Sequence, residues 1–282
     1  MNKAEELKLQ KIALDARKNI LDMVYNAQSG HPGGSLSATE ILIYLYFKQM
    51  NIDPRNPKWE ERDRFVLSKG HVTPILYYCL AEKGYFPKEE LINFRKYGSM
   101  LQGHPDMKKT PGVDMSTGSL GQGLSCAVGM AYVGKKGSKE FDVYAVVGDG
   151  EIQEGQIWEA AMFAGNHKLN NLCVIVDYNH IQICGRVEEV NDPAPIDEKF
   201  EAFGFDSVIC DGHDFESLEK AFRKFKRTDK PLVIIAQTVK GKGISFMEDT
   251  AAWHGKAPNE DMYLRAVAEL ELKEAELKEA EK

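Results

Sequence analysis

The sequence predicts an α/β fold in which a mostly parallel sheet carries helices on both faces. Short apolar segments rich in β-branched residues alternate along the chain with longer stretches of helical periodicity. Parallel strands need long crossover connections, so this alternation favours a parallel sheet covered on both sides. A length of 282 residues, 43% of them hydrophobic, is enough for one large domain with a buried core.

The chain begins with an amphipathic helix. Over residues 4–26, apolar side chains recur on one helical face. A Gly/Pro-rich break at residues 29–34 ends this helix. A second helix is expected to begin at Ser37, which stands three residues before Glu40 as in a capping box. Prolines and charges at residues 53–61 indicate a surface connection.

Strands and helices then alternate to the end of the chain. The predicted strands are residues 65–67, 143–147, 172–176 and 232–236, with 207–210 as a further candidate. The helices predicted between them are 120–132, 157–167 and 215–225. Residues 269–282 are almost all helix formers and are expected to form a frayed or exposed helix. We therefore predict a domain over residues 1–260 and a charged C-terminal helix over residues 261–282.

The composition argues against several classes of protein. A net charge of −7 gives no general attraction to nucleic acid or anionic lipid, and the sequence contains no strongly basic patch. No run of about 18 apolar residues and no signal peptide are found, so no membrane partner is expected. The five cysteines are an odd number without a CxxC pair, which is typical of buried thiols in a reducing cytosol. We expect a cytoplasmic protein.

Two polar residues follow neighbouring strands at the edge where an open parallel sheet binds its ligands. Asp149 lies within Gly148-Asp149-Gly150 after one predicted strand, and Asn179 lies just past the next. Their oxygens could face one point and bind Mg²⁺ or Ca²⁺, with a phosphate completing the coordination. The alternative is an ordinary turn and a helix cap. The spacing of the pair across a strand, a helix and a strand favours the metal site.

A glycine-rich turn at residues 116–123 leads into a predicted helix. The free N–H groups and the positive dipole at a helix N-terminus favour phosphate. The turn matches neither the G-x-G-x-x-G fingerprint nor the Walker A motif, and such turns also serve simply for close helix packing.

Four of the seven histidines lie in turns that contain glycine or proline. They are His31, His71, His104 and His254. A tightly held turn can present an imidazole for proton transfer or for hydrogen bonding to a hydroxylated or phosphorylated ligand. No pair has the i, i+4 spacing of a zinc motif. Each alone could be an ordinary surface or core histidine, and we assign no role to the others, His167, His180 and His213.

Taken together, these motifs resemble those of thiamine-diphosphate enzymes, and specifically those of the transketolase family. The matching motifs are SGHPGG at 29–34, SKGH at 68–71, QGHPD at 102–106, STGSLGQG at 116–123, and GDG with Asn179. The resemblance spans residues 31–254, and the motifs follow the family's order. The α subunits of pyruvate-dehydrogenase type share the GDG signature but not this set of histidines.

The resemblance implies a role for each matching residue. Asp149, Asn179 and the main-chain carbonyl of Ile181 would hold a divalent metal, Mg²⁺ or alternatively Ca²⁺ or Mn²⁺, on the diphosphate of thiamine diphosphate. The residues expected around the cofactor are His71, Gly118, Leu120, Gly150, Asn179 and His254. The residues expected to act in catalysis are His31, His104, His254 and Glu154, of which Glu154 would lie in an interface network between two active sites.

Two positions depart from the family's motifs. Ser119 stands where the family often has proline, and Val72-Thr73 stands where it has a pair of small residues. Neither change removes an expected ligand, but both affect the expected shape of the pocket.

The resemblance also implies that this chain is one part of an enzyme. A transketolase has a diphosphate-binding, a pyrimidine-binding and a C-terminal domain, and only the first is matched. The chain is therefore expected to be the N-terminal subunit of a split transketolase, active with a C-terminal partner subunit that carries the pyrimidine-binding domain, in two copies of each. The implied reaction moves a two-carbon ketol unit from a ketose or ketose phosphate to an aldose or aldose phosphate.

Two alternative functions stay open. One is the same chemistry on a branched or sulfonated sugar. The other is a non-catalytic regulatory protein that keeps the cofactor fold.

Overall fold

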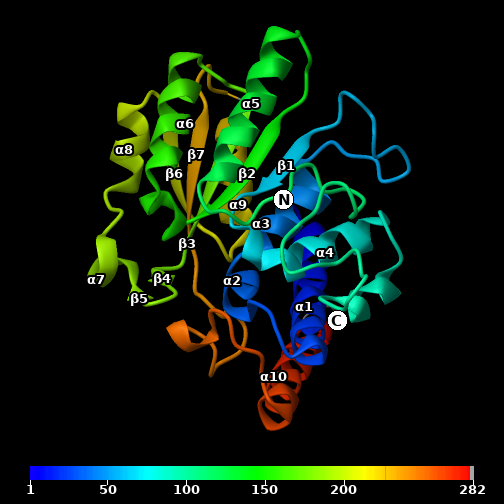
Figure 1. Cartoon of the computed structure of the whole chain (residues 1–282). Helices are drawn as coiled ribbons and strands as arrows, with labels where there is room; N and C mark the ends of the chain where they lie inside the picture. Colours follow the sequence, from blue (N-terminus) through cyan, green and yellow to red (C-terminus); the bar gives the residue numbers. More distant parts are fainter. Residues whose placement is uncertain (226, 280–282) are drawn as a thin grey trace.

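A computed structural model describes residues 1–225 and 227–279 and has a five-stranded parallel sheet at its centre (Figure 1). The strands are β1 (Arg64–Leu67), β2 (Val143–Gly148), β3 (Leu172–Tyr178), β6 (Asp206–Asp211) and β7 (Leu232–Gln237). Their order in the sheet is β1-β2-β3-β7-β6, and every neighbouring pair is parallel. The predicted fold class is confirmed. A short antiparallel hairpin of β4 (Ile181–Gln182) and β5 (Gly185–Arg186) forms a second sheet.

Helices cover both faces of the sheet because its strands are apolar on both sides. In β2, Val143 and Ala145 belong to one buried cluster, whereas Tyr144 and Val146 belong to another. The first cluster contains residues of α5 (Gln122–Lys136), α6 (Gly155–Asn166) and α8 (Ile196–Ala202). The second contains residues of α1 (Lys3–Ala27), α2 (Pro32–Ser37), α3 (Thr39–Tyr44), α4 (Thr73–Lys83) and α9 (Phe215–Phe225). Shorter helical segments are Leu45–Gln49, Gly70–Val72, Lys88–Asn93, Glu151–Gln153, α7 (Val187–Asn191) and Ala251–Trp253.

The start of the second helix differs from the prediction. Helix α2 begins at Pro32, inside the expected break, with proline in its first turn. The expected capping box is wrong, because Ser37 and Glu40 are buried and have distant partners. Ser37 Oγ donates to Asp177 Oδ2 at 2.6 Å, and the carboxylate of Glu40 pairs with Arg17 at 2.6 Å. Tertiary contacts override the local motif here.

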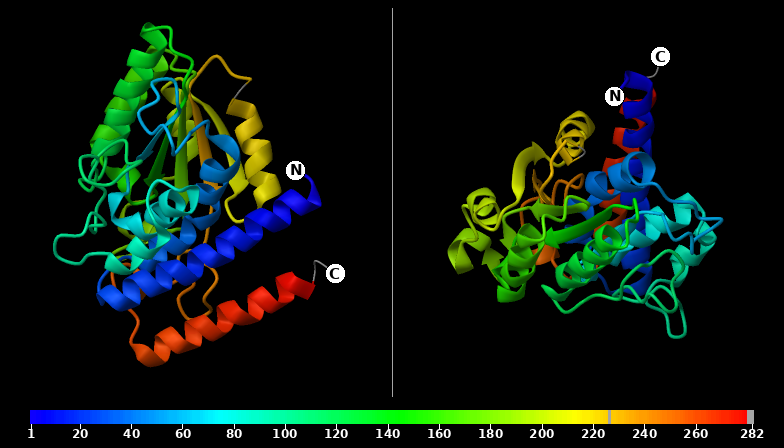
Figure 2. Two further views of the ribbon diagram at one scale, coloured as in Figure 1. Left: turned by 90° about the vertical axis from the view of Figure 1, so that its right-hand side faces the viewer. Right: turned by 90° about the horizontal axis from the view of Figure 1, so that it is seen from above.

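The C-terminal helix α10 (Glu260–Glu279) packs along α1, and the two run side by side in opposite directions (Figure 2). Ala266 and Leu270 are buried, and Tyr263 stacks on Tyr25 with ring centroids 4.1 Å apart. The outer face is exposed as expected, but the helix is not merely frayed, since its inner face completes a core. Residues 280–282 lie outside the described part of the chain.

The cysteines are only partly as expected. All five are free, and Cys79, Cys173 and Cys210 are buried. Cys126 is half-buried and Cys184, between β4 and β5, is exposed, so burial of every thiol is not observed. Within residues 1–225 and 227–279, no helix has the length and apolarity needed to cross a membrane.

Candidate active site

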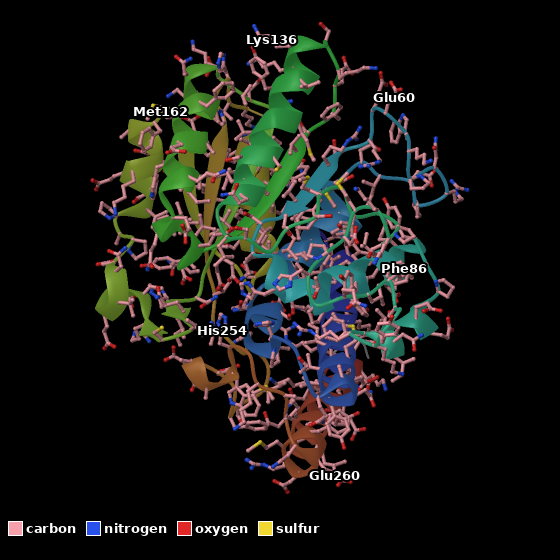
Figure 3. All side chains as sticks on the ribbon, viewed as in Figure 1. Glu60, Phe86, Lys136, Met162, His254 and Glu260 are labelled. Carbon is pink, nitrogen blue, oxygen red and sulfur yellow. The ribbon has the colours of Figure 1, made fainter. Side chains whose placement is uncertain are left out.

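A cavity of about 390 Å³ opens at the carboxyl ends of the strands. His254, one of the residues that line it, is labelled in Figure 3. The predicted site residues that line it are His31, His71, Gly118, Leu120, Asp149, Gly150, Glu154, Asn179, Ile181 and His254. Among the predicted site residues, only His104 is not part of this lining. Residues from positions 31 to 254 thus meet in one place because parallel strands end at the same edge.

Two of the predicted metal ligands, Asp149 and Asn179, directly follow the adjacent strands β2 and β3, and the third, Ile181, lies in β4. Gly148 pairs with Asp177 in the register of β2 and β3, so the residues that follow are neighbours. Asp149 Oδ2 accepts a hydrogen bond of 2.6 Å from the His180 amide, directly after Asn179. Burial, followed by the charge of Asp177, raises the pKa of Asp149 to about 6. A buried carboxylate, an amide oxygen and a carbonyl suit a divalent cation, which would stabilise the carboxylate charge.

Two buried lysines also line the cavity. Lys69 pairs with the carboxylate of Asp177. Lys240 Nζ donates to the carbonyl of Ile181 at 2.7 Å and lies 3.0 Å from His254 Nδ1. Burial, followed by the charge of Lys69, lowers the pKa of Lys240 to about 8. We did not predict a role for either lysine, although both occur just after predicted strands. The charge of Lys69 is compensated by Asp177, so it is the Lys240 ammonium, beside a set of oxygen ligands, that suits an anionic ligand that carries a metal.

Three histidines form a cluster in the same cavity. The ring centroids of His31, His71 and His254 lie 5.0 to 5.5 Å from one another. Burial is the main cause that lowers their pKa values, to about 4 for His31, about 2 for His71 and about 3 for His254, and nearby cations add to it. The three rings are therefore neutral at pH 7 and can exchange hydrogen bonds without carrying charge.

Comparison with known proteins identifies the family. Residues 9–274 match the family model described as transketolase, thiamine diphosphate binding domain. The chain belongs to the transketolase family. It is 48% identical over 268 residues to a 6-deoxy-6-sulfo-D-fructose transketolase subunit from Clostridium sp. (strain MSTE9), covering 95% of this chain and 98% of that protein. It is 42% identical over 255 residues to an apulose-4-phosphate transketolase subunit from Phocaeicola vulgatus, covering 90% of each.

Solved transketolases share the fold. The structure of transketolase from Campylobacter jejuni superposes with a TM-score of 0.87 at 35% sequence identity, over 99% of this chain and 48% of that one. Mouse transketolase is 44% identical over 283 residues, which cover 43% of its length. The chain therefore spans a little less than half of these longer transketolases and nearly all of the two relatives named as subunits.

Glu151 fixes the glycine-rich turn of this transketolase-family domain through hydrogen bonds. Its carboxylate accepts hydrogen bonds from the amides of Gly121 and Gly148 and from the hydroxyl of Ser68, at 2.5 to 3.0 Å. The amide of Gly121, at the start of α5, is therefore already used, and it is Gly118 that lines the cavity. Nothing in the sequence pointed to Glu151 beyond its place next to the GDG motif.

His104 supports this turn instead of lining the cavity. A Cβ on Gly118 would stand 2.7 Å from Cδ2 of His104, and Gly118 has a φ of 144°, so only glycine fits. The ring of His104 thus packs on the turn that forms the cavity wall, and its expected role toward the sugar stays a prediction.

The departures from the family motifs have structural consequences. Val72 is fully buried, and a Cβ on Gly34 would come within 2.7 Å of its Cγ1, so the larger residue fills the space that glycine leaves. Thr73 Oγ1 donates to the carbonyl of Gly103 at 3.1 Å and joins α4 to the turn before His104. Ser119 is exposed.

Proposed function

We propose that this chain is the cofactor-binding subunit of a two-subunit transketolase. It would move a two-carbon ketol unit from a ketose or ketose phosphate to an aldose or aldose phosphate. The observation that carries the proposal is the single cavity that collects oxygen ligands, two lysines and three neutral histidines in a transketolase-family domain. The names of the two relatives covered over nearly their whole length, both subunits, support a partner chain.

The donor set fits thiamine diphosphate with a divalent metal. Asp149, Asn179 and the Ile181 carbonyl would hold Mg²⁺, or Ca²⁺ or Mn²⁺, because all three offer hard oxygens. Lys240 would offset the charge of the diphosphate, whereas the charge of Lys69 is already compensated by Asp177. When bound, the cofactor supplies the electron sink for cleavage of a carbon–carbon bond.

The chain's own contribution would be to position the sugar and to exclude water. Nδ1 of His254 faces the Lys240 ammonium at 3.0 Å and Nδ1 of His31 faces Arg95 at 3.4 Å, so in both neutral rings Nδ1 accepts and the Nε2 proton can be donated to a sugar hydroxyl. The low pKa values of His31, His71 and His254 keep these rings uncharged beside the lysines. His104 would act by supporting Gly118, and Glu154, exposed at the mouth, would belong to the contact between chains.

The partner would close the open side of the cavity. Leu120 and Ile183, which line it, are 37% and 67% exposed, so an apolar rim faces outward. We propose a C-terminal transketolase subunit with the pyrimidine-binding domain as that partner, in two copies of each. The free cysteines support action in the cytoplasm.

The test is donor-to-acceptor ketol transfer with thiamine diphosphate and Mg²⁺, with and without the partner. We expect activity from the pair only. Robust transfer by this chain alone would contradict the two-subunit proposal.

The metal assignment has its own test. Asp149→Ala should abolish metal-dependent binding of thiamine diphosphate to the assembled pair, because it removes the carboxylate from the cation site. The far-UV circular dichroism spectrum, which reports the secondary structure, should stay unchanged, since Asp149 lies at a strand tip. Unaltered affinity by calorimetry would show that the metal is held elsewhere.

A second candidate is the same transfer on a modified sugar. Two relatives that are covered over 98% and 90% of their length are named for 6-deoxy-6-sulfo-D-fructose and for apulose 4-phosphate, and this favours it. Rates of the reconstituted pair with sulfonated, branched and ordinary ketose donors separate the two. A strong preference for ordinary pentose phosphates would exclude this candidate.

A regulatory protein is the third candidate. It predicts lost ligands, whereas Asp149, Asn179 and the four histidines are all present. Absence of transfer by every tested pair, with cofactor bound, would favour it.

A further inference from the structure

The loop at residues 238–243 follows β7 and brings Lys240 to the cavity. Its backbone is held by a largely buried network of Arg17, Glu40 and His213, none of which lines that cavity. They come from α1, α3 and the turn after β6, so segments far apart in sequence meet at this loop. His213 is one of the histidines to which the motifs gave no role.

The hydrogen bonds fix where the protons of the network lie. The amide of Val239 donates to Nε2 of His213 at 2.9 Å, so that nitrogen must offer a lone pair. In a neutral ring the proton is then on Nδ1, which donates to Glu40 Oε2 at 2.8 Å. Glu40 also accepts hydrogen bonds from both terminal nitrogens of Arg17, at 2.6 and 2.9 Å. Burial alone would raise the pKa of Glu40, but Arg17 and His213 lower it to about 2, so the carboxylate is charged.

Arg17 holds the same loop at a second point. Its Nε donates to the carbonyl of Lys242 at 2.9 Å. At Gly243, which has a φ of 102°, a Cβ would come within 2.6 Å of that Nε, so the close approach requires glycine. Lys240 therefore lies between two backbone groups, the amide of Val239 and the carbonyl of Lys242, that one network holds.

Burying the charged pair of Arg17 and Glu40 costs solvation free energy, so the pair need not make the folded protein more stable. The network is better explained by the single arrangement that it imposes on the loop. We propose that His213 is a positioning residue which, with Glu40 and Arg17, fixes the loop that places the Lys240 ammonium at the cavity. Its effect on diphosphate binding rests on the proposed function, whereas the fixing of the loop does not.

The first experiment measures the loop itself by hydrogen exchange on the full chain without ligand. In His213→Leu, which cannot accept from Val239, we expect the amides of residues 239–242 to exchange at least about tenfold faster. His213→Gln should restore slow exchange, because its amide oxygen can replace Nε2 as acceptor. His167→Leu, a histidine at the end of α6, is the matched control and should leave this loop unchanged.

A further variant covers the case in which the leucine protein does not fold. His213→Asn can keep the donor to Glu40 but is too short to accept from Val239, so it should exchange like the leucine variant. Unchanged exchange in the folded variant that lacks the acceptor would overturn the proposal.

The second experiment measures affinity for thiamine diphosphate with Mg²⁺ in the reconstituted pair. His213→Leu should raise Kd about tenfold, which is the size of one lost hydrogen bond to a charged group. In a Lys240→Met background the same change should have almost no further effect, because the route through Lys240 is already gone. Additive losses would mean a merely structural role and would contradict the proposal.

The two experiments separate two failures. If wild-type pairs bind no thiamine diphosphate, the proposed function fails, while the exchange result still decides the role of His213. If binding is normal and exchange does not respond to His213, the positioning role fails alone.

Discussion

His71 shows, at the scale of one residue, how a cavity can keep an imidazole neutral. Burial and the charge of Lys69 lower its pKa to about 2, and His31 and His254 share its surroundings. In the unfolded chain the same side chain has an ordinary pKa near 6.5. Below that pH the unfolded state therefore binds a proton that the native state does not.

The sign of this effect gives a prediction. The stability that His71 contributes is complete above pH 6.5 and is lost as the pH falls below that value, by at most about 1.4 kcal/mol per pH unit. His71→Asn should therefore flatten the fall of Tm between pH 6.5 and pH 4.5. Thermal unfolding of both proteins across this range is the measurement. Parallel curves that differ only in height would contradict the low pKa.

Glu151 links the ends of β1 and β2 to the start of α5, and its contacts yield a second prediction at this scale. Glu151→Gln replaces one accepting oxygen of the carboxylate with an NH₂ group, which then faces a hydrogen-bond donor of the protein. We therefore expect the free energy of unfolding to fall by about 1–3 kcal/mol. Glu154→Gln, three residues along and exposed, is the control and should change it by less than about 0.5 kcal/mol. Urea unfolding of the two variants measures both. Equal losses would mean that the buried hydrogen bonds contribute little.

Among the elements, the strands were predictable because parallel strands buried on both faces appear in a sequence as short apolar runs. The capping box expected at Ser37 and Glu40 was wrong, since both side chains are bonded to partners more than twenty residues away. The oxygen ligands and the cavity histidines were found because they follow strands or lie in tight turns. Lys69 was missed because lysine is normally exposed, and only its pairing with Asp177 permits burial.

Helix α10 is the element whose packing the sequence least indicated. Leu270 is fully buried against α1, whereas Leu272, two residues later, is 67% exposed. Leu270→Ala should lower the free energy of unfolding by about 2–5 kcal/mol through the cavity it leaves. Leu272→Ala should change it by no more than about 0.5 kcal/mol. Denaturant unfolding of the two proteins measures the difference, and equal small effects would show that α10 is not docked in solution.

At the scale of the whole molecule, the open cavity implies that cofactor binding and assembly with the proposed partner are coupled. One wall comes from this chain, and the proposed partner would supply the other across the rim at Leu120 and Ile183. A ligand held by two chains binds the assembled form better than either chain alone. Linkage then requires that the cofactor strengthen assembly by the same factor by which assembly strengthens cofactor binding.

This reciprocity is measurable with the two purified subunits. Thiamine diphosphate with Mg²⁺ should lower the dissociation constant of the pair, by about 5–150-fold if the coupling has a typical size. Sedimentation with and without the cofactor gives that factor, and calorimetry of cofactor binding with and without the partner gives its counterpart. Asp149→Ala should reduce both factors towards one, because the diphosphate loses its metal anchor. The prediction would be contradicted if the cofactor left the dissociation constant of the pair unchanged and bound this chain alone with full affinity. The entire binding site would then lie within this chain.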